Sequence, residues 1–171
     1  RPVRLELSRE EEFISSRTRH PQTMTYRTGI NDDGALVAQE MRLVGNTGPF
    51  GTHGFSVQAV AGLRGLTSYN APNKRFDCEV AYTNIPVPGA YRGYGAPQAL
   101  FGLECHMEDI AADLELDPID FRRQNWAKTG DELNLAPHIG EQALVEAEFD
   151  EYPIVMSDGI EECVAQGARA I

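Results

Sequence analysis

Apolar and charged side chains alternate over residues 2–7, a pattern typical of a strand with one buried face. Residues 23–30, 35–44 and 75–82 are rich in β-forming residues and are also predicted to be strands. Residues 31–34 read Asn-Asp-Asp-Gly between two of these stretches. Because Asp and Gly tolerate the positive φ of a tight turn, we predict a hairpin there.

Helical periodicity dominates the second half of the chain. Residues 100–114 place apolar side chains at three- and four-residue spacing, with acidic residues on the other faces. Ser8 and Glu11 form a capping box, and Asp117-Pro118 is a typical helix start. The predicted helices cover residues 9–15, 56–66, 100–114, 118–127 and a last segment capped by residues 157–161, whereas residues 133–150 are acidic and only weakly periodic.

These elements together predict an α+β fold in which a meander of mixed strands is followed by helices. The chain opens and closes within patterned runs, so we expect residues 1–171 to form a single segment of a larger polypeptide. This segment divides into a strand-rich part over 1–84, a loop over 85–98 and a helical part over 98–171.

Charge and cysteine content narrow the classes of partner and compartment. The 171 residues carry 15 basic and 26 acidic side chains, a net charge of −11, which disfavours binding to nucleic acid. No apolar run approaches the ~18 residues that span a bilayer, so we expect no membrane segment. Cys78, Cys105 and Cys163 are far apart in the sequence. We expect them to be buried, unpaired thiols in the reducing cytoplasm rather than ligands of zinc.

One segment combines several features of a binding loop. Residues 89–98, Gly-Ala-Tyr-Arg-Gly-Tyr-Gly-Ala-Pro-Gln, lead into the long predicted helix. Glycines allow close backbone approach, a helix N-terminus favours an anion, and Tyr91, Tyr94 and Arg92 add planar surfaces and a permanent cation. Such a loop suits a phosphorylated, partly aromatic ligand. It fits equally well a tight helix-entry loop in which the tyrosines only pack.

The loop GAYRGYGAPQ with its following acidic helix resembles the molybdopterin-binding loop of a known enzyme family. RPVRLELSREEEFISSRTRHP and LECHMEDIAADLELDPIDFRRQN are similar to further segments of that family, at matching spacing over residues 1–131. The family is that of the xanthine dehydrogenase/aldehyde oxidase molybdenum hydroxylases. The resemblance implies a portion of the molybdenum-cofactor-binding domain of the large subunit.

The resemblance also implies a cofactor and the residues that hold it. The backbone of Tyr91, Arg92 and Gly93 would contact molybdopterin, possibly present as a dinucleotide. No side chain of this chain is expected to ligate the metal. The glutamate that serves the family as catalytic base is expected downstream, so no catalytic residue is assigned here and the isolated chain is expected to be inactive.

The implied substrate channel brings in residues from two segments. Tyr94 matches the family aromatic that stacks on substrate, and His53 and Ser56 would line the channel. Val60 falls where purine-oxidising members carry an arginine. Because valine offers neither charge nor hydrogen-bond donors, an aldehyde or another N-heterocycle is favoured over a purine of the xanthine type.

The implied activity is oxidative hydroxylation of an aldehyde or N-heterocycle, with water as the source of oxygen. The implied partners are the rest of the molybdenum-binding subunit and domains or subunits that carry a 2Fe–2S cluster and FAD, in an oligomeric cytoplasmic assembly. Two alternatives are a non-catalytic binding or assembly domain that kept the fold, and a member of the aromatic acyl-CoA reductase branch.

Overall fold

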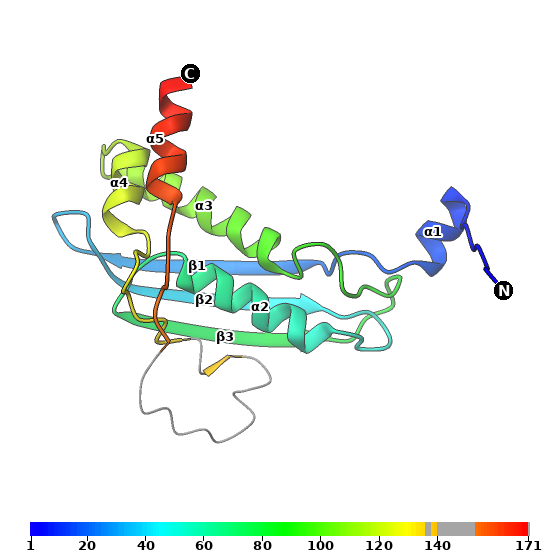
Figure 1. The fold of residues 1–171 in the computed structure, drawn as a ribbon. Coiled ribbons are helices and arrows are strands. Elements are labelled where there is room, and N and C mark those ends of the chain that lie inside the picture. The colour runs from blue at the N-terminus through cyan, green and yellow to red at the C-terminus, as the bar shows by residue number, and fades with distance from the viewer. Residues whose placement is uncertain (136–137, 140–152, 171) are drawn as a thin grey trace.

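The computed structural model describes residues 1–135, 138–139 and 153–170 (Figure 1). The elements in chain order are α1 (Arg9–Ser15), β1 (Gln22–Ile30), β2 (Leu36–Asn46), α2 (Gly54–Thr67), β3 (Asn73–Ala81), α3 (Ala96–Asp113), α4 (Pro118–Asn125) and α5 (Ile160–Ala170). The predicted hairpin, the capping box of the first helix and the Asp117 cap of α4 are confirmed. No helix within the described ranges is long and apolar enough to cross a membrane.

The three strands form one mixed sheet in the order β1-β2-β3. β1 runs antiparallel to β2, whereas β2 and β3 run parallel. A parallel pair needs a long crossover, and α2 provides it between β2 and β3. The expected meander is therefore wrong in this detail, because β2 and β3 run parallel, whereas a meander joins neighbouring antiparallel strands.

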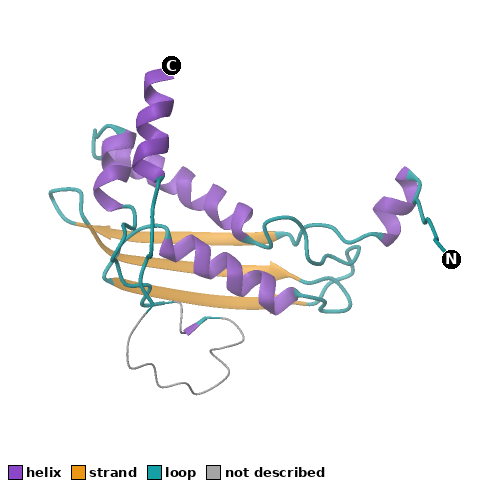
Figure 2. Cartoon of the chain, viewed as in Figure 1, coloured by secondary structure: helices purple, strands orange, loops and turns teal. Residues whose placement is uncertain are grey.

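Helices cover one face of the sheet (Figure 2). α2 packs on β2 and β3, and α3 packs beside α2 and against β1. The strand register aligns Tyr26, Met41 and Phe76 in one row beneath these helices. The buried residues of this layer are Met41, Leu43, Ala61, Leu66 and Ala99.

The opposite face of the sheet is charged. Three ion pairs lie on this face. Arg27–Glu40 at 3.9 Å and Arg42–Glu79 at 2.8 Å join neighbouring strands, and Arg75–Asp77 at 2.8 Å lies within β3. Exposed pairs of this kind contribute only about 0–1 kcal/mol each, so the sheet is held mainly by its helical side.

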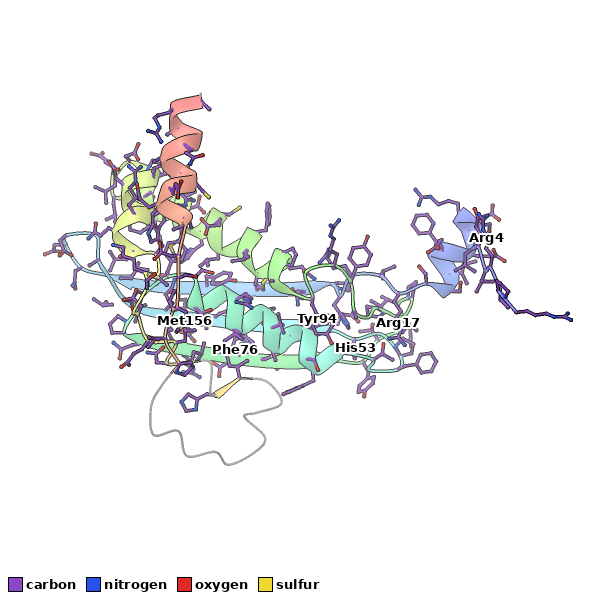
Figure 3. All side chains as sticks on the ribbon, in the orientation of Figure 1. Arg4, Arg17, His53, Phe76, Tyr94 and Met156 are labelled. Carbon is purple, nitrogen blue, oxygen red and sulfur yellow. The ribbon has the colours of Figure 1, made fainter. Side chains whose placement is uncertain are left out.

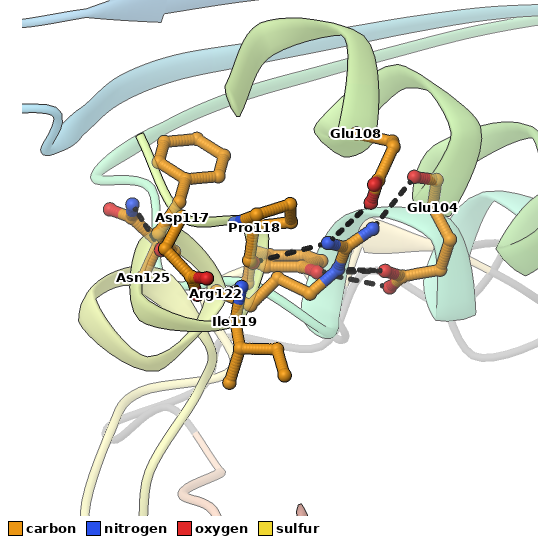
Figure 4. A network of polar contacts seen from close by, with 9 residues as sticks. Glu104, Glu108, Asp117, Pro118, Ile119, Arg122 and Asn125 are labelled. Carbon is orange, nitrogen blue, oxygen red and sulfur yellow. Dashed lines mark hydrogen bonds and ion pairs between the residues drawn. The ribbon is translucent and has the colours of Figure 1, made fainter. Parts of the chain in front are cut away.

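A polar network joins α3 to α4 (Figure 4). The Arg122 guanidinium donates to the carboxylates of Glu104 and Glu108, each at 2.8 Å. The Tyr69 hydroxyl donates to the same Glu104 carboxylate at 3.0 Å, and burial raises the pKa of Tyr69, so it stays a neutral donor. Nearby, the buried Asn125 side chain accepts from the backbone N–H of Leu36 at 3.0 Å, which fixes α4 to the start of β2.

Two local predictions are wrong. Residues 2–7 form no strand: Val3 and Leu5 are 92% and 85% exposed, and an alternating pattern gives a stable strand only where a neighbouring strand pairs with it. The three cysteines are exposed rather than buried. Most of the acidic stretch over 133–150 lies outside the described residues.

We predict that Gly62→Ala destabilises the protein by about 1–3 kcal/mol, measured by chemical unfolding. An added Cβ would lie 2.3 Å from the Phe76 ring, so α2 could not keep its distance from β3. Phe76→Leu in the same chain should recover part of the loss. Gly167→Ala is the matched control, because this helical glycine has nothing within 4 Å of an added Cβ. The unfolding free energy of the Gly167→Ala protein should stay unchanged or rise, because alanine favours a helix more than glycine does. Equal effects of Gly62→Ala and Gly167→Ala would contradict the packing argument.

Candidate functional site

Two loops meet at one end of the sheet. Because β2 and β3 are parallel, their carboxyl ends share an edge, and the loops that lead into α2 and α3 both leave from it. The loops are tied together where Thr83 N–H donates to Gly48 O at 3.2 Å and the Thr52 hydroxyl donates to Pro88 O at 2.9 Å. Ligands of sheets with parallel strands bind outside this carboxyl edge, which makes it the candidate site.

His53 and Tyr94 are brought into contact there (Figure 3). The His53 Nδ1 atom lies 2.7 Å from the Tyr94 hydroxyl, and the rings meet edge to face with centroids 5.8 Å apart. His53 immediately precedes α2, whereas Tyr94 lies in the loop before α3. The side chains are 41 positions apart in the sequence, so the fold and not local geometry creates the pair.

The backbone is strained at both residues. Positive φ occurs at three described non-glycine residues, and two of these are His53 at 54° and Tyr94 at 50°. A left-handed conformation costs an L-residue roughly 1–2 kcal/mol, and such costs are concentrated at functional sites. The hydrogen bond between the two side chains helps to hold this conformation.

Gly95 sets how closely α3 approaches α2. Its φ is 96°, and an added Cβ would lie 2.2 Å from the Val57 carbonyl oxygen of α2. Glycine therefore satisfies two requirements at this position, a conformation that L side chains rarely adopt and a backbone-to-backbone contact.

The two helix starts at the site are left open to an anion. Neither α2 nor α3 has a side-chain cap or an acidic residue in its first turn. By contrast, α1 and α4 are capped by Ser8 and Asp117 and carry acids in their first turns. Gly54 N–H and Ala96 N–H already donate to Gly51 O and Gly93 O, and Pro97 has no N–H, so it is mainly the dipoles of the two helices that favour a negatively charged group at this end of the molecule.

Arg19, in the segment before β1, contacts the loop that precedes α3. Arg19 Nη2 donates to Arg92 O at 2.8 Å, Arg19 Nη1 donates to Gln98 Oε1 at 3.2 Å, and the guanidinium lies 4.7 Å above the Tyr91 ring centroid. The sequence pattern assigned no role to Arg19 or Gln98. They are 79 positions apart, so no periodicity links them, and the only signal was the Arg-His-Pro segment.

The predicted cofactor residues are accessible. Tyr91, Arg92 and Gly93 are exposed, so the backbone of the loop can be reached from solvent. The predicted channel residues Ser56 and Val60 are half-buried. They lie three and seven positions after His53, a spacing that places them on one face of α2. The structure thus brings His53 and Tyr94 into contact, whereas the Tyr91 ring packs against Arg19.

The site offers amide donors, two positive helix ends and aromatic surface. In the described part of the chain, no group of three or more His, Cys, Asp or Glu side chains is placed to hold a metal ion. An anionic organic cofactor held mainly by backbone amides fits this donor set, because amides satisfy phosphate and carbonyl oxygens without any protein ligand to a metal.

The fold and the site are those expected of a domain for an anionic cofactor, with a glycine-rich loop beside two helix starts that carry no acidic residue in their first turns. Residues 1–126 match the family described as molybdopterin cofactor-binding domain, and the chain belongs to that family. The resemblance noted in the sequence, and molybdopterin as the cofactor of the family, are thereby confirmed.

Curated relatives and solved structures agree with this assignment. The chain is 34% identical to the xanthine dehydrogenase molybdenum-binding subunit of Escherichia coli O157:H7 over 98% of its own length and 20% of the relative. It is 40% identical to the nicotinate dehydrogenase large molybdopterin subunit of Eubacterium barkeri over 78% of its length and 31% of the relative.

The aldehyde oxidoreductase of Desulfovibrio gigas superposes with a TM-score of 0.65 at 32% identity, covering 71% of this chain and 14% of that one. Quinoline 2-oxidoreductase from Pseudomonas putida 86 shows the same fold, with a TM-score of 0.69 at 21% identity, covering 96% of this chain and 20% of that one. These structures confirm the α+β class as a portion of a molybdopterin-binding subunit. The chain spans about a fifth of the E. coli relative's length.

We predict that the His53–Tyr94 contact couples the two residues by about 0.5–1.5 kcal/mol in a double-mutant cycle of unfolding stability with His53→Ala and Tyr94→Phe. Removing either partner breaks the same hydrogen bond, so the second change adds little. Thr28→Val is the control, because the Thr28 hydroxyl lies 3.0 Å from His106 Nε2 near the opposite end of β1, and its effect should add to that of His53→Ala. Additivity in both cycles would show that the two residues are energetically independent.

Proposed function

We propose that this chain is the molybdopterin-binding part of a molybdenum hydroxylase that oxidises an aldehyde or an N-heterocycle, with water as the source of oxygen. The observation that carries this proposal is the convergence of two uncapped helix starts on the exposed loop of a molybdopterin-family domain. When bound, the cofactor supplies the two-electron oxidation chemistry, which no side chain can provide.

The loop residues hold the cofactor in this proposal. The exposed backbone of Tyr91, Arg92 and Gly93 binds it, and the positive ends of α2 and α3 stabilise its negative charge. Gly95 keeps the two helix starts close enough to act on one ligand. These groups bind and orient the cofactor and exchange no protons with it.

The channel residues position the substrate. The ring of Tyr94 stacks on it, and the bond to His53 fixes the plane of that ring. Ser56 and Val60 follow on α2 as the wall of the channel. The apolar side chain at position 60 favours an aldehyde or an uncharged N-heterocycle, since Val60 cannot donate hydrogen bonds to a purine.

The remaining parts of the enzyme lie outside this chain in our proposal. The rest of the molybdenum-binding subunit supplies the base glutamate and further cofactor contacts, and 2Fe–2S and FAD components pass the electrons on in an oligomeric cytoplasmic assembly. Large apolar side chains that are exposed here support such packing; they include Phe13, Ile14, Phe50 and Phe101.

The first test is metal and pterin analysis of the native polypeptide that carries these residues, followed by turnover of aldehydes and N-heterocycles in isotopically labelled water. We expect molybdenum, a fluorescent oxidised pterin and one labelled oxygen in each hydroxylated N-heterocycle, the substrate class whose product count is not blurred by exchange of a carbonyl oxygen with water. A native protein without molybdenum or pterin would refute the proposal and favour a non-catalytic assembly domain. Turnover of an aromatic acyl thioester instead would indicate the reductase branch.

The second test concerns the channel wall. Val60→Arg in the native enzyme should raise kcat/KM for xanthine relative to an aldehyde by about tenfold or more, because it adds a charged fork of hydrogen-bond donors to the channel. Val60→Leu adds bulk without charge and should leave the ratio unchanged. If both variants shift the ratio equally, bulk and not hydrogen bonding at position 60 sets the preference.

A further inference from the structure

Arg19 makes three contacts with residues 91–98 of the cofactor loop from outside that loop. It precedes β1, and its guanidinium reaches across to the loop before α3. One nitrogen donates to Arg92 O at 2.8 Å and another to Gln98 Oε1 at 3.2 Å. The guanidinium carbon also lies over the Tyr91 ring, 4.7 Å from its centroid. A single group therefore fixes a carbonyl, an amide and a ring, which suits the rigid fork of arginine and not the point charge of lysine.

Gln98 completes the connection. Its Oε1 accepts from Arg19, while its Nε2 donates to the His20 carbonyl at 3.2 Å, so both ends of the amide are held by adjacent residues. The His20 ring is 2% exposed, and its Nδ1 lies 2.9 Å from Asn46 O. Because a carbonyl only accepts, Nδ1 carries the proton and donates to the end of β2. Arg19 is thus anchored through Gln98 and His20 to the sheet, and is not a freely moving surface side chain.

Arg19 pairs with no carboxylate among the described residues. Glu12, which lines the same pocket, is outnumbered there by Arg9, Arg17 and Arg19. A permanent cation that contacts the backbone of the loop adds to the positive potential of the two helix starts. The same side chain therefore sets the shape of the loop and favours an anion beside it.

We propose that Arg19 is a positioning residue for the cofactor: it holds the backbone of Tyr91 and Arg92 in the conformation that presents the loop amides. This inference rests on the proposed function, because it takes residues 91–93 as the cofactor contact. Arg19 itself contacts the loop and not the reacting atoms. Without its guanidinium, Arg92 O loses its donor and the Tyr91 ring its cation, so the loop samples conformations in which its amides no longer converge.

The test uses the native holoenzyme with Arg19→Ala, Arg19→Lys and the control Arg64→Ala. Arg64 is exposed on α2, and its substitution removes the same charge elsewhere. The readout is the rate at which the cofactor leaves the protein, measured as fluorescent pterin after the released material has been oxidised. This rate is compared with the unfolding midpoint of each variant. We expect Arg19→Ala to release pterin about 10- to 100-fold faster than wild type, since hydrogen bonds from a charged group are lost. Arg19→Lys should release it at an intermediate rate, and Arg64→Ala at the wild-type rate.

Chemical rescue separates positioning from a general loss of stability. Guanidinium ion, added far below denaturing concentration, should slow the release from Arg19→Ala, whereas methylammonium, a cation without the fork, should not. Wild-type release rates in Arg19→Ala would overturn the inference. So would faster release that matches a lowered unfolding midpoint and responds to neither cation. If the wild-type protein holds no pterin at all, the proposed function fails first, and that result is distinct from either outcome for Arg19.

Discussion

The close contact of α3 with α2 is the constraint on which the rest of the site depends. At Gly95 the backbone of one helix start lies against the Val57 carbonyl of the other, at a distance that leaves no room for a Cβ. The parallel pairing of β2 and β3 makes this contact possible, because both strands deliver their following helices from the same edge. Two helix N-termini that could have pointed at different solvent regions therefore point at one. The left-handed backbone of His53 and Tyr94 is a consequence, since each residue has to turn the chain sharply into a helix whose position is already fixed.

Elements whose signals are local were predictable from the sequence. The capping box of Ser8 and Glu11, the Asp117-Pro118 helix start and the turn over residues 31–34 each depend on interactions within three or four residues, and all three are present. Strand direction is not local. Residues 75–82 have the composition of a strand in any sheet, and only the length and apolar face of the intervening helix distinguish a parallel crossover from a meander. The strand predicted over residues 2–7 was wrong because strand formation also depends on distant residues. These residues have the pattern of a strand but no partner strand among the described residues.

In the candidate site too, contacts within one segment were predictable from the sequence, whereas contacts between distant segments were not. The glycines, tyrosines and helix start of the loop are contiguous, so the sequence indicated a binding loop, and the family match supports it. The resemblance implied that His53 and Tyr94 both belong to the substrate channel, but their contact across 41 positions was not predicted and is shown by the structure. Arg19 and Gln98 received no role, because an arginine before a strand and a glutamine in the first turn of a helix have many ordinary uses. The role that we propose for Arg19 rests on contacts that only the structure shows, at the end of the sheet where Arg19 reaches both Gln98 and the loop.

Net charge is a poor guide to what this site attracts. The chain carries −11, which argues against a polyanionic partner at long range. At physiological ionic strength, however, charges beyond about 8 Å are largely screened, so a ligand at the loop responds to its nearest groups. The acids of α4 and of the Arg122 network lie away from the loop, and Glu12 of α1 shares its pocket near Tyr91 with the cations Arg9, Arg17 and Arg19. The first turns of α2 and α3 carry no negative charge. The distribution of acids in the fold, and not their number, is what makes an acidic protein able to hold an anionic cofactor.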